Sequence, residues 1–171
     1  DGGGIYVSAG TFNVIWTEIK SNTSISGSGG GVYTKSGSSF TGVNSLFFGN
    51  TATDGKGGSA KLQGTPKLYG CKFESSTAKS NIAKALEVVA STEFHYCTFL
   101  DTLGVGDQYL VYSTGKPAYK GCLFASPKSA FEGTIADSFD STALPPISES
   151  LATLPTDTFD LDGDNDKGEP L

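Results

Sequence analysis

Four aspartates near the C-terminal end of the chain have a spacing that can serve cation binding. Asp160, Asp162, Asp164 and Asp166 alternate with other residues in the run Asp-Leu-Asp-Gly-Asp-Asn-Asp. Alternate carboxylates in a short loop can converge on Ca²⁺, which takes about six to eight oxygen ligands. An EF-hand loop is excluded, because neither Asp160 nor Asp162 is followed by glycine at the sixth position of such a loop. Two interpretations stay open, a Ca²⁺ site and a solvated acidic turn.

The three cysteines are the second group with chemical potential. Cys71, Cys97 and Cys122 recur at nearly constant spacing, without a Cys-x-x-Cys pair, and His95 is the only histidine. This spacing does not fit a zinc site. We expect three buried free thiols that act as small apolar side chains. A disulfide between two of them is the alternative, and it leaves one thiol over.

An enzyme acting on polysaccharides is the catalytic alternative. A glycoside hydrolase needs two carboxyl groups at a defined separation on one face, and Glu74 with Asp101 come closest to such a pair. A polysaccharide lyase needs a strongly cationic group beside its acids, yet every basic residue of this chain is lysine. We therefore expect no catalytic centre, and a lyase or hydrolase fragment remains the alternative.

The elements that position these residues follow an internal repeat. A triplet ending in Ile or Phe recurs with steps of 28, 26, 26 and 25 residues, and Gly-Gly-Gly at 2–4 returns at 29–31. Each unit holds short alternating runs of Val, Ile, Phe, Tyr and Thr between Gly, Ser and Asn, which are strand and turn signals. A leucine-rich repeat has a similar length, but its leucine framework is missing. The pattern predicts an all-β, single-stranded parallel β-helix of about five coils, one coil per unit.

Strand periodicity predicts which side chains stack inside such a helix. Residues of equal position lie above one another at a spacing of about 4.8 Å. We expect inward ladders of phenylalanine and cysteine, and an inward pair of turn asparagines. Their members are Phe47, Phe73, Phe99, Phe124, Cys71, Cys97, Cys122, Asn22 and Asn50.

Four aromatic residues are expected to point outward. Trp16 and Tyr96 are placed on equivalent strands three coils apart, and Tyr6 and Tyr33 lie on another strand in adjacent coils. Such rings can form a sugar-stacking platform, so glycans are one class of partner. Scattered surface aromatics are the alternative explanation.

The repeats resemble those of polymorphic outer-membrane-protein adhesins and related bacterial surface proteins. The matches are Gly3-Gly4-Ile5, Gly30-Gly31-Val32 and Phe47-Phe48-Gly49-Asn50, whereas Ile19 replaces the phenylalanine in the first unit and Ser76 and Thr102 replace the asparagine in later units. The Asp-rich tail also resembles the end of such proteins. The resemblance implies a right-handed β-helix, secretion and exposure at the cell surface, but no particular ligand.

Composition and domain organisation complete the expected function. The net charge of −6 and the absence of arginine argue against nucleic acid as a partner, and no apolar run reaches the roughly 20 residues that span a bilayer. We expect coils over 1–126 and a packing or capping extension over 127–171. The expected role is a noncatalytic secreted or cell-surface module, structural or adhesive. Its partners would be flanking coils or other copies joined head to tail in a filament, or glycans on a neighbouring cell; a carbohydrate-active enzyme fragment or glycan-binding domain is the alternative.

Overall fold

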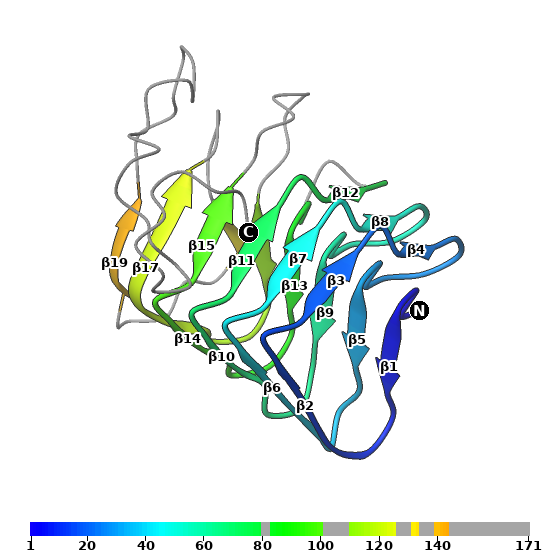
Figure 1. Cartoon of the computed structure of the whole chain (residues 1–171), viewed down its shortest axis with the longest axis horizontal. Helices are drawn as coiled ribbons and strands as arrows, with labels where there is room; N and C mark the ends of the chain where they lie inside the picture. The colour runs from blue at the N-terminus through cyan, green and yellow to red at the C-terminus, as the bar shows by residue number, and fades with distance from the viewer. Residues whose placement is uncertain (80–82, 101–109, 126–130, 134–138, 144–171) are drawn as a thin grey trace.

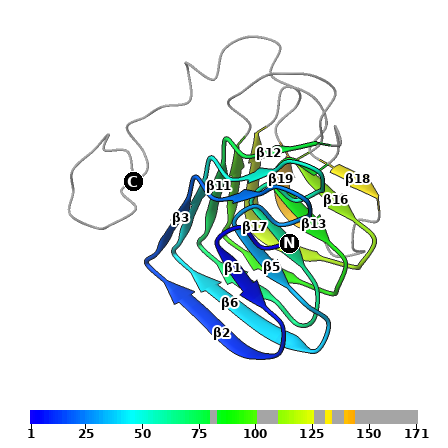
Figure 2. The same cartoon turned by 90° about the vertical axis from the view of Figure 1, so that its right-hand side faces the viewer.

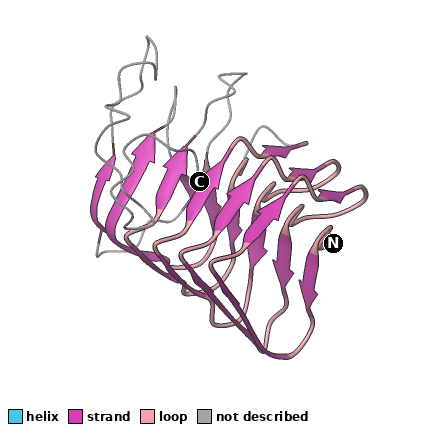
Figure 3. Ribbon diagram, in the orientation of Figure 1, coloured by secondary structure: helices cyan, strands magenta, loops and turns pink. Residues whose placement is uncertain are grey.

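The chain winds into a right-handed parallel β-helix, as the sequence predicted (Figure 1). The computed structural model describes residues 1–79, 83–100, 110–125, 131–133 and 139–143. These residues form strands, turns and loops without a helix (Figure 3). Successive units return to the same walls, so each strand pairs in parallel with the strand one repeat away.

The first wall is a six-stranded parallel sheet. Its strands, in spatial and chain order, are β1 (Ile5–Val7), β5 (Val32–Thr34), β9 (Ala60–Leu62), β13 (Leu86–Val88), β16 (Val111–Ser113) and β18 (Phe131–Gly133).

The second and third walls belong to one ten-stranded sheet that bends at a corner. The second wall contains β2 (Gly10–Ile15), β6 (Ser38–Val43), β10 (Lys67–Tyr69) and β14 (Glu93–His95). The third contains β3 (Glu18–Lys20), β7 (Leu46–Phe48), β11 (Lys72–Glu74) and β15 (Thr98–Leu100). Strand β17 (Ala118–Ala125) serves both walls and pairs with β19 (Phe139–Ala143).

A short fourth element follows the third wall in the first three coils. Its strands are β4 (Thr23–Ser24), β8 (Thr51–Ala52) and β12 (Thr77–Ala78), which pair in parallel. Viewed from the first coil, the strands of later coils lie behind those of earlier ones (Figure 2).

The coil count differs slightly from the expected five. Four coils have separate second- and third-wall strands, and in the fifth coil these walls merge into β17. Strands β18 and β19 pair with β16 and β17, so parallel pairing continues past residue 126, where the sequence repeat ends. The other residues of the expected 127–171 extension lie outside the described residues.

The phenylalanine ladder is confirmed as the centre of the core. Ring centroids are 4.5 Å apart for Phe47 and Phe73, 5.0 Å for Phe73 and Phe99, and 4.5 Å for Phe99 and Phe124. All four rings are fully buried. Tyr119 from the second wall meets the Phe124 ring edge-on at 5.2 Å. Stacked and edge-on aromatic contacts add to the free energy gained by burial, and they define the register of neighbouring coils.

The two turn asparagines also stack inward, as expected. The Asn50 side chain accepts hydrogen bonds from the Asn22 backbone N–H and from Asn22 Nδ2, both at 3.1 Å. Its own Nδ2 donates to the Ile19 carbonyl at 2.7 Å. Asn50 is buried, whereas Asn22 in the first coil is half-buried. The ladder thus joins two coils through side chains that are otherwise shielded from water.

Glycine opposite each asparagine makes room for this ladder. A Cβ at Gly4 would lie 2.8 Å from Asn22 Cγ, and a Cβ at Gly31 would lie 3.1 Å from Asn50 Cγ. In the third coil serine occupies both equivalent positions, and the hydroxyls of Ser59 and Ser76 are 2.6 Å apart. The smaller turn residue leaves space that the larger strand-side residue fills. Packing volume at this contact is therefore conserved between coils although the residue types change.

Candidate functional site

The first coil forms an open end of the solenoid. Its strands β1, β2, β3 and β4 are all edge strands of their sheets, so each presents unpaired backbone groups along one side. Among the described residues, five of the eight exposed large hydrophobic side chains belong to this coil. They are Tyr6, Phe12, Ile15, Trp16 and Ile25. We call this surface the open end.

The interior ladder is also accessible at the open end. Phe12 of β2 pairs in register with Phe40 of β6, and the two rings lie parallel with centroids 6.5 Å apart. Phe40 is fully buried, but Phe12 is 41% exposed. The exposed face of Phe12 is therefore the place where the next ring of a continuing ladder would stack.

A second surface lies on the outer face of the second wall. Tyr69, His95 and Lys120 are register partners on β10, β14 and β17. The Tyr69 and His95 rings stack with centroids 5.0 Å apart, and the Tyr96 ring lies 6.4 Å from that of His95. We call Tyr69, His95 and Tyr96 the aromatic cluster.

Charged groups lie directly beside the aromatic cluster. Glu93 Oε2 is 3.7 Å from both Lys67 Nζ and His95 Nε2. Glu93 and Lys67 are each half-exposed, so their contribution to stability is small. Hydrogen-bond donors and acceptors thus lie within reach of a molecule that rests on the rings.

The two tryptophan and tyrosine residues expected on one strand lie instead at a corner. Trp16 directly follows β2, and Tyr96 directly follows β14. Both have positive φ, 49° and 55°, and both are strongly exposed at 63% and 73%. The two rings belong to coils one and four, so they form no common platform. Tyr69 and His95, which the sequence reasoning did not single out as binding residues, are the partners of Tyr96.

The outward tyrosine pair on the first wall has a structural environment. Tyr6 and Tyr33 stack at 5.3 Å with an interplanar angle of 17°. Lys61 Nζ lies 5.6 Å from the centre of the Tyr33 ring and 3.2 Å from Glu87 Oε2. Tyr33 is only 8% exposed. Its ring therefore offers little surface to a ligand, whereas Tyr6 is open to solvent at the first coil.

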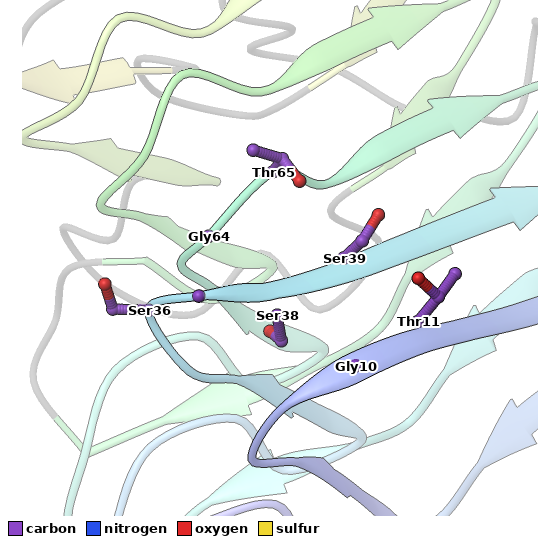
Figure 4. A pocket seen from close by; sticks show the side chains of 8 residues that line it. Gly10, Thr11, Ser36, Ser38, Ser39, Gly64 and Thr65 are labelled. Carbon is purple, nitrogen blue, oxygen red and sulfur yellow. The ribbon is translucent and has the colours of Figure 1, made fainter.

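A shallow hollow lies at the corner between the first and second walls (Figure 4). Its volume is about 430 Å³. Glycine, serine and threonine line it, and the Ser38 hydroxyl donates to the Lys35 carbonyl at 2.6 Å. Glycines 10, 37 and 64 have positive φ there. This lining offers hydroxyl groups without a charged or aromatic partner.

The cysteines are buried free thiols, as predicted. Cys71, Cys97 and Cys122 lie within 3.5–3.6 Å of the carbonyl oxygens of Tyr69, His95 and Lys120, respectively, two residues earlier in the chain. Burial raises the pKa of Cys97 well above its ordinary value, and the thiols of Cys122 and Cys71 act in the same direction. A hydrogen bond with Cys97 lowers the pKa of Cys71.

The carboxylates of the described coils are paired with cations or backbone N–H groups. Lysines lie within ion-pair distance of Glu18, Asp54, Glu74, Glu87 and Glu93, and Asp1 accepts from the Ser28 backbone N–H at 2.8 Å. Asp101, the expected partner of Glu74, lies outside the described residues.

No group of three or more His, Cys, Asp or Glu side chains in the described coils is arranged to hold a metal ion. The aspartates expected to bind Ca²⁺, at positions 160, 162, 164 and 166, lie outside the described residues. Within the described residues, no helix has the length and apolar character needed to cross a membrane.

Comparison with known proteins adds no relative. No protein-family model matches the chain, and searches of curated proteins and of solved structures found no significant match.

Proposed function

We propose that this chain is a noncatalytic structural module, secreted or held at a cell surface, that associates head to tail with other copies through its open end. The observation that carries the proposal is the coincidence of edge strands and apolar exposure in the first coil. Unpaired parallel edges favour addition of further strands, and solenoids generally need their terminal coils covered. The matching surface is the opposite end of another copy, because it continues each sheet in the same direction.

The distribution of charges supports a structural role. In the described coils the acidic groups contact lysines rather than one another, and the Lys61–Glu87 pair joins adjacent coils on the first wall. Catalytic hydrolysis of glycans requires two carboxyl groups that face a common substrate. Paired carboxylates along the walls instead reduce the repulsion between coils.

The surface composition supports an extracellular setting. Only 18% of the residues are charged, and glycine accounts for 23 positions. The repeat motifs resemble those of bacterial surface adhesins, which is the basis for proposing an adhesive as well as a structural role.

Association can be followed by sedimentation and by the emission of Trp16, the only tryptophan of the chain. We expect the average mass to rise with concentration while the Trp16 emission shifts to shorter wavelength, because association removes this exposed ring from water. Ile15→Lys places a charge on the open end and should shift the association to higher concentration.

Val89→Lys is the matched control, since Val89 is an exposed apolar residue of the fourth coil. It should associate like the wild type. A monomer at every concentration, or equal effects of the two lysine variants, would contradict the proposal.

A further inference from the structure

One corner of the solenoid carries residues in an unfavourable backbone conformation. The five coils place Trp16, Asn44, Gly70, Tyr96 and Gly121 at this corner, all with φ between 45° and 60°. Glycine and asparagine tolerate this left-handed region, whereas bulky side chains rarely adopt it. Two coils nevertheless carry the largest aromatic side chains there. Strain of this kind persists where the surrounding structure holds it, and it is concentrated at functional sites.

Tyr96 differs from Trp16 in its surroundings. The Tyr96 ring lies against the backbone of the next coil, because a Cβ at Gly121 would be 2.7 Å from its Cδ1 and 2.8 Å from its Cε1. The ring is therefore supported on one side although the residue is 73% exposed. Trp16 instead follows Ile15, another exposed apolar residue of the open end.

The neighbours of Tyr96 extend this support into a surface. His95 and Tyr69 stack on each other on adjacent coils, and Glu93 with Lys67 lies one row away on the same outer face. Rings joined to polar groups in this way offer apolar faces together with groups that fix orientation. The surface follows the solenoid axis, since its members repeat from coil to coil at about 4.8 Å.

We propose that the aromatic cluster binds an extended glycan built of neutral pyranose units. The C–H faces of pyranose rings carry partial positive charge and stack on the electron-rich faces of tyrosine and histidine. Glu93 and Lys67 supply an acceptor and a donor for sugar hydroxyls. The exposed outer wall suits a polymer lying along it, because a small molecule is usually bound in an enclosing pocket. The near balance of Lys67 and Glu93 favours a neutral chain over a polyuronate.

This inference rests on the adhesive part of the proposed function and names its ligand class. It does not require association of the open end, which lies on a different coil. The two proposals can therefore fail separately: loss of glycan binding with intact association affects only this one.

The test uses the whole chain and three soluble probes: β-linked oligosaccharides of glucose, β-linked oligosaccharides of N-acetylglucosamine, and oligogalacturonate. Binding is measured by calorimetry and by saturation-transfer NMR at protein concentrations that keep the chain monomeric. We expect at least one neutral probe to bind and oligogalacturonate to bind more weakly. Tyr96→Asn should weaken binding by about tenfold, because an aromatic contact contributes roughly 1 kcal/mol.

Two further variants make the result decisive. Trp16→Asn removes an exposed aromatic from the same kind of corner in the first coil, and it should leave binding unchanged. Tyr69→Thr removes a second ring of the cluster without touching the corner backbone, and it should weaken binding even if Tyr96→Asn folds poorly. The proposal is overturned if neither neutral probe binds, if oligogalacturonate binds best, if Trp16→Asn weakens binding as much as Tyr96→Asn, or if the cluster variants bind like the wild type.

Discussion

Replacing Asn50 with alanine tests the inward turn ladder. The Asn50 side chain takes part in three hydrogen bonds, two with Asn22 and one with the Ile19 carbonyl. It is fully buried, so water does not readily replace the lost partners. Alanine leaves the Asn22 backbone N–H and the Ile19 carbonyl without this side chain.

The expected loss follows from the number of bonds. Each buried hydrogen bond contributes about 1 kcal/mol net, and a stranded buried polar group costs more. Asn50→Ala should therefore reduce the free energy of unfolding by about 3 kcal/mol, a large part of the roughly 5–15 kcal/mol available to a domain. Asn22→Ala removes only the bond from Asn22 Nδ2, so it should cost about 1 kcal/mol.

Urea unfolding followed by circular dichroism measures both losses. The double variant should be no less stable than Asn50→Ala by more than a few tenths of a kcal/mol, since the Asn22 side-chain bond is already lost in that background. The reasoning is refuted if Asn50→Ala costs no more than Asn22→Ala, or if the two losses add in full.

Three other predictions concern glycine packing and the buried titratable groups. Gly30→Ala places a Cβ 2.5 Å from the Gly58 carbonyl oxygen and should cost about 3 kcal/mol in urea unfolding; Gly10→Ala meets no atom within 4 Å and should cost only about 1 kcal/mol of backbone strain. Equal losses would contradict this. Burial raises the pKa values of Cys97 and Tyr119, so stability should be retained below about pH 9 and fall above it as the unfolded groups ionise, by up to about 1.4 kcal/mol per pH unit for each group; a flat profile to pH 11 would contradict this. Alkylation of the native chain, read by mass spectrometry, should modify Cys71 before Cys97, because the hydrogen bond with Cys97 lowers the Cys71 pKa; the reverse order would contradict it.

The walls and their ladders were predictable because the repeat is strict. Phe47, Phe73 and Phe99 are separated by 26 residues each, and strand periodicity then assigns their neighbours to one face. The same reasoning placed the cysteines inside. These assignments need only constant spacing and alternation, which the sequence displays directly.

The corners were less predictable because their residue types change between coils. Trp16 and Tyr96 were assigned to a strand, since aromatic residues favour strands and rarely adopt positive φ. Their alignment with Gly70 and Gly121 at the same offset was the available signal. The Ser59–Ser76 contact was missed for a similar reason: neither serine matches the Gly and Asn of the preceding coils, and only the joint change preserves the packing.

The aromatic cluster required the register as well as the repeat. Tyr69 and His95 have the same offset of 26 residues as the phenylalanines, so the sequence contained the pairing. Its significance depended on Tyr96 turning back over Gly121, which follows from the corner conformation. Composition alone does not reveal that contact.

The most direct test of the account is a set of nuclear Overhauser contacts among phenylalanine rings, measured on a chain with selectively labelled phenylalanine. We predict contacts between Phe47 and Phe73, Phe73 and Phe99, and Phe99 and Phe124, whose centroids lie 4.5–5.0 Å apart. Phe47 and Phe124 should show none, because three coil spacings of about 4.8 Å separate them. Missing contacts between neighbouring coils, or a direct contact between Phe47 and Phe124, would contradict the stacked solenoid.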